Sequence, residues 1–476
     1  MFGGPGKSDA PVFSVDFLRE ACHQMRTSLF GKVGFVLSLM LFSFLYGFAA
    51  RWHRWFPNTV LERTSQQITA LTSAWTPEAT LLTSRVYERE GVRRVKPKQV
   101  QPGLTVVTSA WTGPDGLKPQ IRLLDQRGRS VHTWEIDRQA IFADSALELP
   151  GGAPTRRNIH GSYLLSNGDV LVNLNYAGTA RLDACGQVEW ISMEGNHHSI
   201  SRAPDGSFWI PGSNKKLSST SPAHPDGFPG LNGSLYQEWL LHVGADGSLI
   251  ERINVLDVLY ENGLERYLSK VSQPEAGTGG LQMNDVLHLN DVEVLSPALA
   301  ADFALFDAGD LLASLRNLHL VFVVDPKTRE VLWHASAPFI QQHDPDFLEG
   351  GWIGVFDNNE DFSKRGTMLS GSRIVAFQPS TDSREVRFPT VQSAPFYTST
   401  RGKWQQLSNG NMLLTESNAG RVVEVGPEGQ TVWEWIHPPH KEGQVPVVTK
   451  ATRRDLSRSE VASWPCSSVD TTRAVK

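Results

Sequence analysis

From about residue 104 to residue 439, short apolar runs alternate with polar turns in a unit that recurs along the chain. Each unit has an apolar strand, a turn with glycine, a second apolar strand, and a further strand with Asp or Glu that often ends near Trp. This pattern predicts short antiparallel strands. The copies YLLSNGDVLVNL and QQLSNGNMLLTES, which begin at Tyr163 and Gln405, are among the clearest. The body of the chain is therefore expected to be all-β.

Six copies of the unit can be counted, at residues 106–134, 163–190, 200–253, 292–333, 347–388 and 405–435. A unit of four short strands cannot bury both faces of its sheet alone, so the expected arrangement is radial packing into a six-bladed β-propeller. A pair of β-sandwiches or a solenoid is the alternative. The blade-like spacing of the glycine turns favours the propeller.

A segment of a different kind precedes this body. Residues 33–50 are uncharged and mostly apolar, which predicts one transmembrane helix, with Trp52 and Trp55 as interfacial anchors. A buried helix or a cleaved signal sequence is the alternative. Basic residues flank both sides, so charge barely decides the orientation. We expect a cytoplasmic lead (1–31), the membrane helix (32–51), a short helical stalk (52–103), the catalytic propeller (104–439) and a polar tail on the surface or disordered (440–476).

Composition narrows the function classes. A net charge of -5 gives no general attraction to nucleic acid, which we exclude as a partner. The three cysteines, Cys22, Cys185 and Cys466, are too few and too widely spaced for a disulfide framework or a cysteine zinc site. They leave the redox compartment open.

Histidines recur at one position of the unit. His160, His198 and His343 each lie eight residues before the glycine of a first turn, and His288 opens another copy. Because the entry to each innermost strand lies at the mouth of the central channel, the four side chains are expected to converge there. Any one of them alone could be a structural hydrogen-bond partner. His197 alternates to the opposite side of its strand and is expected to be structural.

The charged and amide residues near these histidines each allow two interpretations, one functional and one structural. Arg316, in SLRN, needs an anion if it is buried, and either a salt bridge to Asp291, Asp344 or Asp357 or an anionic substrate would supply it. Oxygen atoms of several residues could ligate calcium, although turns favour the same residue types. These residues are Asp344, Asp346, Asp357, Asn358 and Asn359.

Residues 160–437 resemble the PAPS-independent arylsulfotransferases, six-bladed propellers that move a sulfuryl group from an aryl sulfate to a phenol. Six stretches carry the resemblance: NHHSISRAPDGSFWIPG, DVLHLNDVEVL, GDLLASLRN, VDPKTREVLWHA, QQHDPDFLEGGWIGVFDNN, and WQQLSNGNMLLTESNAGRVVEVGPEGQTVWEW. The blade motifs gain specificity from SLRN and QHD in that order. The chain lacks the closely spaced cysteine pair of some members, and its membrane anchor replaces their cleaved signal.

The resemblance implies that His343 is transiently sulfated and that His198, His288 and Arg316 bind and polarise the sulfuryl group. We expect His160 and Asn290 to contact the substrate. For His160 this expectation depends only on its equivalent position in the repeat. A cation at Arg316 would lower the pKa of His343 below its usual value of about 6.5, which favours a neutral nucleophile and a ping-pong cycle. No PAPS cofactor is implied.

An aryl sulfate donor fits a propeller on the periplasmic side of the inner membrane, and fold alone does not fix the acceptor. Two rival functions remain. Four convergent histidines could hold non-haem iron, as in the seven-bladed carotenoid-cleaving oxygenases, although Arg316 would repel a metal ion and the count of units is six. The second rival function is binding without turnover, in which the channel holds an anionic ligand or a partner.

Overall fold

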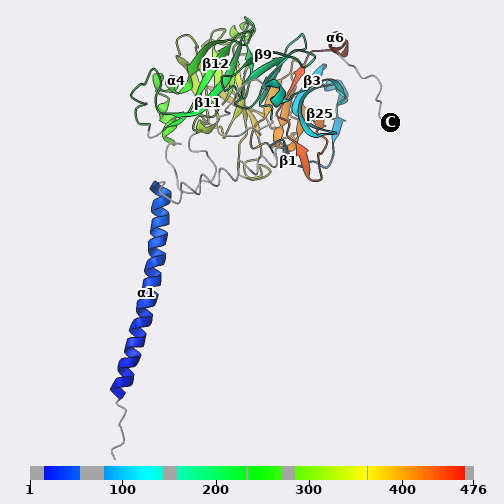
Figure 1. Cartoon of the computed structure of the whole chain (residues 1–476). Helices are drawn as coiled ribbons and strands as arrows, with labels where there is room; N and C mark the ends of the chain where they lie inside the picture. Colours follow the sequence, from blue (N-terminus) through cyan, green and yellow to red (C-terminus); the bar gives the residue numbers. More distant parts are fainter. Residues whose placement is uncertain are drawn as a thin grey trace, which may run out of the picture. The chain divides into compact units, whose positions relative to one another are not determined.

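The computed structural model describes residues 15–53, 80–142, 158–231, 234–270, 285–361 and 363–466. Contacts within the chain divide it into two units, Met1–Trp75 and Thr76–Lys476. In the described part of the first unit the chain forms one helix, α1 (Val15–His53), drawn in blue in Figure 1. The second unit contains the strands.

The expected membrane segment lies within α1. Residues Phe30–Ala50 form a stretch long and apolar enough to cross a membrane. At 1.5 Å per residue its 21 residues span about 31 Å, which matches the hydrocarbon core of a bilayer. Phe30 and Phe42 are 74% and 75% exposed. A helix in a protein core would bury such side chains, so the core-helix alternative is disfavoured.

The second unit has six antiparallel sheets of at least four strands each, and the predicted six-bladed β-propeller is confirmed. Blade 1 contains β27 (Lys450–Arg454), β3 (Leu104–Gly113), β4 (Gly116–Leu124) and β5 (Ser130–Glu135). Blade 2 contains β6 (Gly161–Leu164), β7 (Val170–Asn173), β8 (Thr179–Leu182) and β9 (Val188–Ser192). Blade 3 contains β10 (Ser201–Arg202), β11 (Phe208–Ser218), β12 (Leu235–Val243) and β13 (Leu249–Asn254).

The other three blades follow in chain order. Blade 4 contains β14 (Leu289–Val294), β15 (Leu311–Leu315), β16 (Leu320–Val324) and β17 (Val331–Ala335). Blade 5 contains β18 (His343–Leu348), β19 (Trp352–Asp357), β20 (Arg373–Gln378) and β21 (Ser383–Phe388). Blade 6 contains β22 (Lys403–Gln406), β23 (Met412–Glu416), β24 (Arg421–Val425), β25 (Thr431–Ile436) and, at its outer edge, β2 (Gly91–Arg94). Short helices α3 (Arg138–Ile141), α4 (Val255–Glu261) and α5 (Pro297–Ala300) lie in the connections.

Glycine turns and apolar clusters explain this arrangement. Gly168, Gly206 and Gly410, in the first turns of three blades, have φ values of 92°, 91° and 84°, a region that side chains with a Cβ rarely adopt. Six apolar clusters of buried side chains each join two neighbouring blades. This packing fixes the innermost strands, which carry the candidate site.

The chain after residue 439 is part of the propeller, so the expectation of a polar tail is wrong for the strands and helix found there. β27 pairs with β3 and supplies the innermost strand of blade 1. Its sequence, KATRR, does not show the apolar pattern of a buried strand, because the two buried positions are Ala451 and the charged Arg453. α6 (Arg458–Ala462) follows, and residues 467–476 lie outside the described part.

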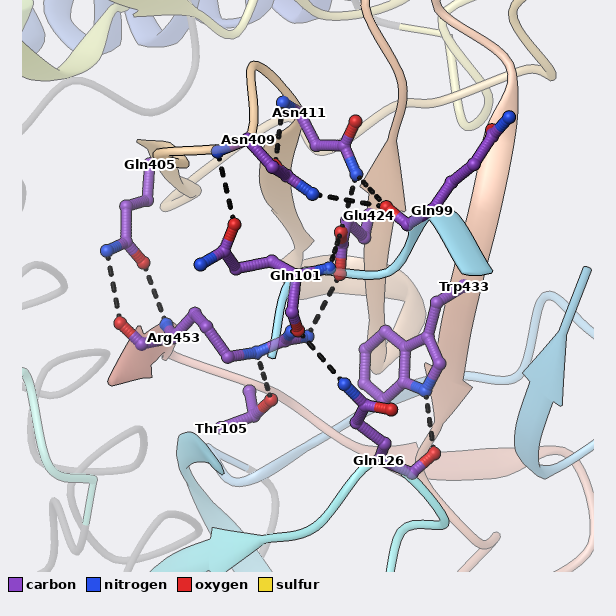
Figure 2. Close-up of polar contacts among 10 residues, drawn as sticks. All are labelled: Gln99, Gln101, Thr105, Gln126, Gln405, Asn409, Asn411, Glu424, Trp433 and Arg453. Atoms are coloured by element: carbon purple, nitrogen blue, oxygen red, sulfur yellow. Dashed lines mark hydrogen bonds and ion pairs between the residues drawn. The ribbon is translucent and has the colours of Figure 1, made fainter. Parts of the chain in front are cut away.

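Arg453 closes the propeller through polar contacts between blades 6 and 1, shown in Figure 2. Its guanidinium lies 3.1 Å from Glu424 Oε2 and donates to Thr105 Oγ1 at 3.0 Å. The backbone of Arg453 exchanges two hydrogen bonds with the side chain of Gln405. Asn411 donates to the second oxygen of Glu424 at 2.7 Å. Burial of this charge is tolerated because every partner is present.

The expected helical stalk is wrong over residues 80–103. The chain there forms β1 (Leu82–Ser84), which pairs with β26 (Gln444–Pro446), then β2 and the single turn η1 (Pro97–Gln99). Leu81 is buried against Ala110 and Leu117, so its apolar character serves contact with the propeller. Residues 54–79 lie outside the described residues.

One disulfide joins Cys185 to Cys466, across 281 residues of sequence. This bridge was not predictable from the spacing of the cysteines, because the two residues are brought together only when β27 pairs in blade 1. It attaches the segment after α6 to the turn between β8 and β9. The side chain of Cys22 lies outside the described part of the chain.

Candidate functional site

The six innermost strands begin around a cavity of about 50 Å³. His160 lies just before β6, His198 before β10, and His343 opens β18, and all three side chains line this cavity with Asn290 of β14. Close approach of two blades here depends on Gly161, because a Cβ at that position would lie 1.7 Å from the carbonyl oxygen of His198.

The structure brings the four predicted histidines together. The ring centroids of His160 and His198 are 3.8 Å apart, and those of His198 and His288 are 5.3 Å apart. Burial, then the neighbouring histidines, His343 among them, lowers the pKa of His198 well below its usual range. His198 and His288 have φ values of 54° and 53°, which cost energy for residues other than glycine and occur often at functional sites.

His343 is held with one nitrogen available. Its Nδ1 lies 2.6 Å from Asn358 Oδ1 and 3.1 Å from the carbonyl oxygen of Gln341. The orientation of the Asn358 amide is fixed, since its Nδ2 donates to the carbonyl oxygens of Thr398 and Arg401. Both neighbours of Nδ1 are acceptors, so Nδ1 carries the proton and Nε2 keeps its lone pair.

Electrostatics keep this imidazole neutral. Burial, then the positive charge of Arg316 and, to a smaller extent, His288, lowers the pKa of His343 to about 3. The hydrogen bond with Asn358 opposes these effects only in part. At neutral pH the ring is unprotonated, which is the state a nucleophile requires.

Arg316 lies directly after β15, with its backbone N–H donating to the carbonyl oxygen of His288 at 3.1 Å. Its guanidinium donates to the amide oxygens of Asn317 and Gln341. Within the described ranges it makes no salt bridge. Of the three carboxylates considered as partners, Asp357 pairs with Arg373 and Asp344 with Lys403. Asp291 has no salt bridge among the residues that the structure describes.

Arg316 and His288 lie beside the 50 Å³ cavity and do not line it. His288 Nδ1 is 2.8 Å from Asp285 Oδ2. Burial lowers the pKa of Arg316, while the charges of Glu360 and Asp285 raise it. A largely buried cation with neutral hydrogen-bond partners has capacity for an anion.

Several residues at the site were missed by sequence reasoning. Tyr176, between β7 and β8, has its ring 4.5 Å from His197 and 6.5 Å from His160. His197, expected on the opposite side of the strand, has its Nδ1 2.6 Å from that of His198. Lys403 lines the cavity as well. Only the NYAG turn and the HH pair signalled these contacts, and neither pattern is specific.

Four of the five side chains considered for calcium have an oxygen atom engaged by the protein. Asp344 and Asp346 bind Lys403, Asp357 binds Arg373, and Asn358 Oδ1 lies 2.6 Å from His343 Nδ1. The amide nitrogen of Asn359 donates to two backbone carbonyl oxygens. Across the described residues, no group of three or more His, Cys, Asp or Glu side chains is arranged to hold a metal ion.

Beyond the histidines, along the same strands, lies a second cavity of about 310 Å³. It shares Ser199, Asp291, Lys403 and Lys450 with the smaller one. The two cavities therefore adjoin within the central channel.

Comparison with known proteins gives one match in sequence. A family model described as arylsulfotransferase (ASST) matches residues 161–438, more than half of the chain. A search of the curated proteins finds no match. A solved structure of a protein of unknown function from Bacteroides caccae aligns over 73% of this chain and 99% of its own at 11% identity and a TM-score of 0.44. Streptogramin B lyase aligns over 76% and 97% at 12% identity and a TM-score of 0.37. These structural similarities are too distant to inform function.

Proposed function

The chain belongs to the arylsulfotransferase family, and on that basis we propose that it transfers a sulfuryl group from an aryl sulfate to a phenol, with His343 as the group that carries the sulfuryl between them. One observation supports this proposal most: a buried neutral imidazole has its proton held at Nδ1 by Asn358 and its Nε2 lone pair free. Arg316 lies close enough for its charge to affect that ring.

In the first half of the reaction, Nε2 of His343 attacks the sulfur of the aryl sulfate. The bond between sulfur and the phenolic oxygen breaks, and the phenolate leaves. In the second half, the oxygen of an acceptor phenol attacks the same sulfur, the nitrogen–sulfur bond breaks, and neutral His343 is restored. The acceptor loses its proton and the first leaving group gains one, so the cycle is balanced.

Arg316 and the other histidines suit the charge of this group. Arg316 keeps its positive charge at neutral pH despite burial and would bind the sulfuryl oxygens. His198 would donate one ring N–H, His288 would contact the sulfuryl group with the ring nitrogen that does not face Asp285, and Asn290 would orient the substrate from the cavity wall. Donors already in place stabilise charge as it develops in the transition state. His160 would complete the wall through its contact with His198.

We also propose that α1 anchors the chain in the inner membrane, with the propeller on the periplasmic side. The uncovered apolar side chains of Phe30–Ala50 support an anchor. The Cys185–Cys466 disulfide supports an oxidising compartment, where such bonds persist. Protease added to intact spheroplasts that express the full chain should degrade the propeller. Protection of the propeller until the membrane is lysed would contradict this orientation.

The test of the activity uses the full chain in detergent with p-nitrophenyl sulfate and a panel of phenols. We expect release of p-nitrophenol that depends on the acceptor and is abolished in His343→Ala. His242→Asn is the matched control, since His242 stacks on Trp209 in blade 3, away from the channel histidines. An absence of transfer to every phenol would contradict the proposal and favour the binding function.

A further inference from the structure

A group of charged side chains occupies the channel next to the histidines. We call it the channel charge cluster: Asp291, Glu293, Asp344, Asp346, Lys403 and Lys450. They come from four of the innermost strands, β14, β18, β22 and β27. All except Asp344 line the 310 Å³ cavity, and Asp344 lines the smaller one.

Most members of the cluster are held in place by contacts. Lys403 Nζ binds Asp344 and lies 3.3 Å from Asp346 Oδ1. Lys450 Nζ donates to the carbonyl oxygen of Ser162 at 3.0 Å. Glu293 Oε2 accepts from the backbone N–H of Phe347 at 2.7 Å.

Asp291 differs from the others. Within the described residues, no hydrogen bond or ion pair engages its carboxyl group, although the residue is only 8% exposed. It lines both cavities. It is therefore the member of the cluster best placed to exchange a proton with either space.

The charges in the cluster do not balance. Four carboxyl groups face two ammonium groups within the cluster, and the guanidinium groups of Arg454 and Arg401 belong to the walls of the larger and the smaller cavity. Because the carboxyl group of Asp291 is buried and has no direct partner among the described residues, its protonated form is favoured. Burial accordingly raises the pKa of Asp291 well above its usual range and that of Asp346 to about 7, and it lowers the pKa of Lys450 to about 8.

The two cavities offer a path for that proton. They share Asp291, Ser199 and the two lysines, and their walls are polar. A water molecule occupies about 30 Å³ in the liquid, so both spaces are large enough to hold water. The other titratable or charged residues on the walls of the smaller cavity are His160, His198, His343 and Arg401.

We propose that Asp291, as part of the channel charge cluster, stores the proton that the sulfuryl transfer releases and consumes. This inference depends on the proposed function. When the sulfur–oxygen bond of the donor breaks, the Asp291 carboxyl gives its proton, through cavity water, to the departing phenolate. When the acceptor phenol attacks the sulfur on His343, its proton returns to the Asp291 carboxylate. The cluster ends the cycle with the proton count it began with.

The test compares two donors in the first turnover, before acceptor is added. Phenyl sulfate has a basic leaving group that needs a proton, whereas p-nitrophenolate leaves without one. In Asp291→Asn, the first turnover should fall on the order of 100-fold with phenyl sulfate, as for loss of a general acid, and change less than about twofold with p-nitrophenyl sulfate. Asp346→Asn should show the same selectivity, more weakly. Thr452→Val, an uncharged change in the same cavity wall, is the control and should leave both donors unaffected.

Equal losses with the two donors would indicate a structural effect and would overturn the proposal. Infrared spectroscopy of the full chain gives a readout that does not need activity. A protonated carboxyl band should be present at neutral pH and should weaken in Asp291→Asn. Absence of this band from the wild type would overturn the proposal that the cluster stores a proton. If the band is present and no donor is used, the proposed function fails, and the role of the cluster in it fails too.

Discussion

The two cavities of the central channel are formed by the same innermost strands, and they hold opposite chemistry. At the beginning of the strands, burial and the charge of Arg316 lower the pKa of His343 and keep its ring unprotonated. Further along, burial raises the pKa of Asp291 well above its usual range and that of Asp346 to about 7, which favours the protonated carboxyl form. Burial disfavours the charged form in both places, so it leaves a free base at one end and a proton donor at the other.

This contrast shows how one scaffold separates two tasks. A nucleophile must lose its proton before substrate arrives, while a proton store must keep one until a phenolate appears. The two tasks are met by different residue types, histidine for the nucleophile and aspartate for the proton store, and the charged side chains around them also differ. The lysines lie among the carboxyl groups, and Arg316 lies near the histidines.

The largest effect is expected from removing the cation. Arg316→Met should lower transfer about 10²- to 10³-fold, as does the loss of one donor to a developing oxyanion. The variant should also raise the pKa of His343, because the positive charge that lowers it is gone. Steady-state kinetics and the pH profile of the first turnover measure both. Transfer within threefold of the wild type would contradict the role of Arg316.

Variants of Asn358 test whether the proton of His343 must lie on Nδ1. Asn358→Leu removes the acceptor for the Nδ1 proton of His343 and should reduce transfer about 10- to 100-fold, the range seen when a supporting hydrogen bond is lost. Asn358→Asp keeps an acceptor and adds negative charge, so it should retain more activity and move the acid limb of the pH profile to higher pH. If both variants lose activity equally with unchanged profiles, Asn358 serves packing only.

The two cavities should also respond to pH with opposite sign in stability. The folded-state pKa of His198 is lowered, so below about 6.5 the unfolded state binds more protons and the wild type loses stability as pH falls. The folded-state pKa of Asp291 is raised, so above about 3.8 the folded state binds more protons and stability is lost as pH rises. From pH 8 to pH 5, His198→Asn should therefore gain stability relative to the wild type, and Asp291→Asn should lose it.

The relative gain for His198→Asn should be at most about 2 kcal/mol, since about 1.5 pH units separate 6.5 from pH 5 and each corresponds to about 1.4 kcal/mol. Urea titrations of the two variants and the wild type at both pH values provide the measurement. Shifts of the same sign in the two variants would contradict the contrast between the cavities.

The smallest expected effect is an absence of change. With p-nitrophenyl sulfate, the first turnover should vary less than about twofold between pH 8 and pH 5, because His343 remains unprotonated well above its pKa of about 3. A fall centred near pH 6.5 would mean that the imidazole titrates as it does in solvent.

Much of the fold was predictable because each blade repeats its own pattern. The glycine turns at Gly168, Gly206 and Gly351 mark the same place in three blades, and the interval of eight residues before them identified His160, His198 and His343. Closure of the ring was not predictable. In strand β27, Arg453 is buried and its partner Glu424 lies in another blade. No local pattern in KATRR predicts that contact.

The candidate site divides in the same way. His160, His198, His288 and His343 were found from register, since equivalent positions of a radial repeat must converge. The orientation of the Asn358 amide depends on the carbonyl oxygens of Thr398 and Arg401, which are 40 and 43 residues away. Tyr176 and Lys403 also reach the site from turns and strands that the sequence marks only as ordinary blade segments.

The central claim is that His343 carries the sulfuryl group. The direct measurement is mass spectrometry of the full chain after brief exposure to p-nitrophenyl sulfate without acceptor, followed by peptide mapping at alkaline pH. We predict one added sulfuryl group on the peptide that contains His343, absent in His343→Ala and removed when a phenol is added. Release of p-nitrophenol with no labelled protein, or a label on another residue that a phenol discharges, would contradict the account.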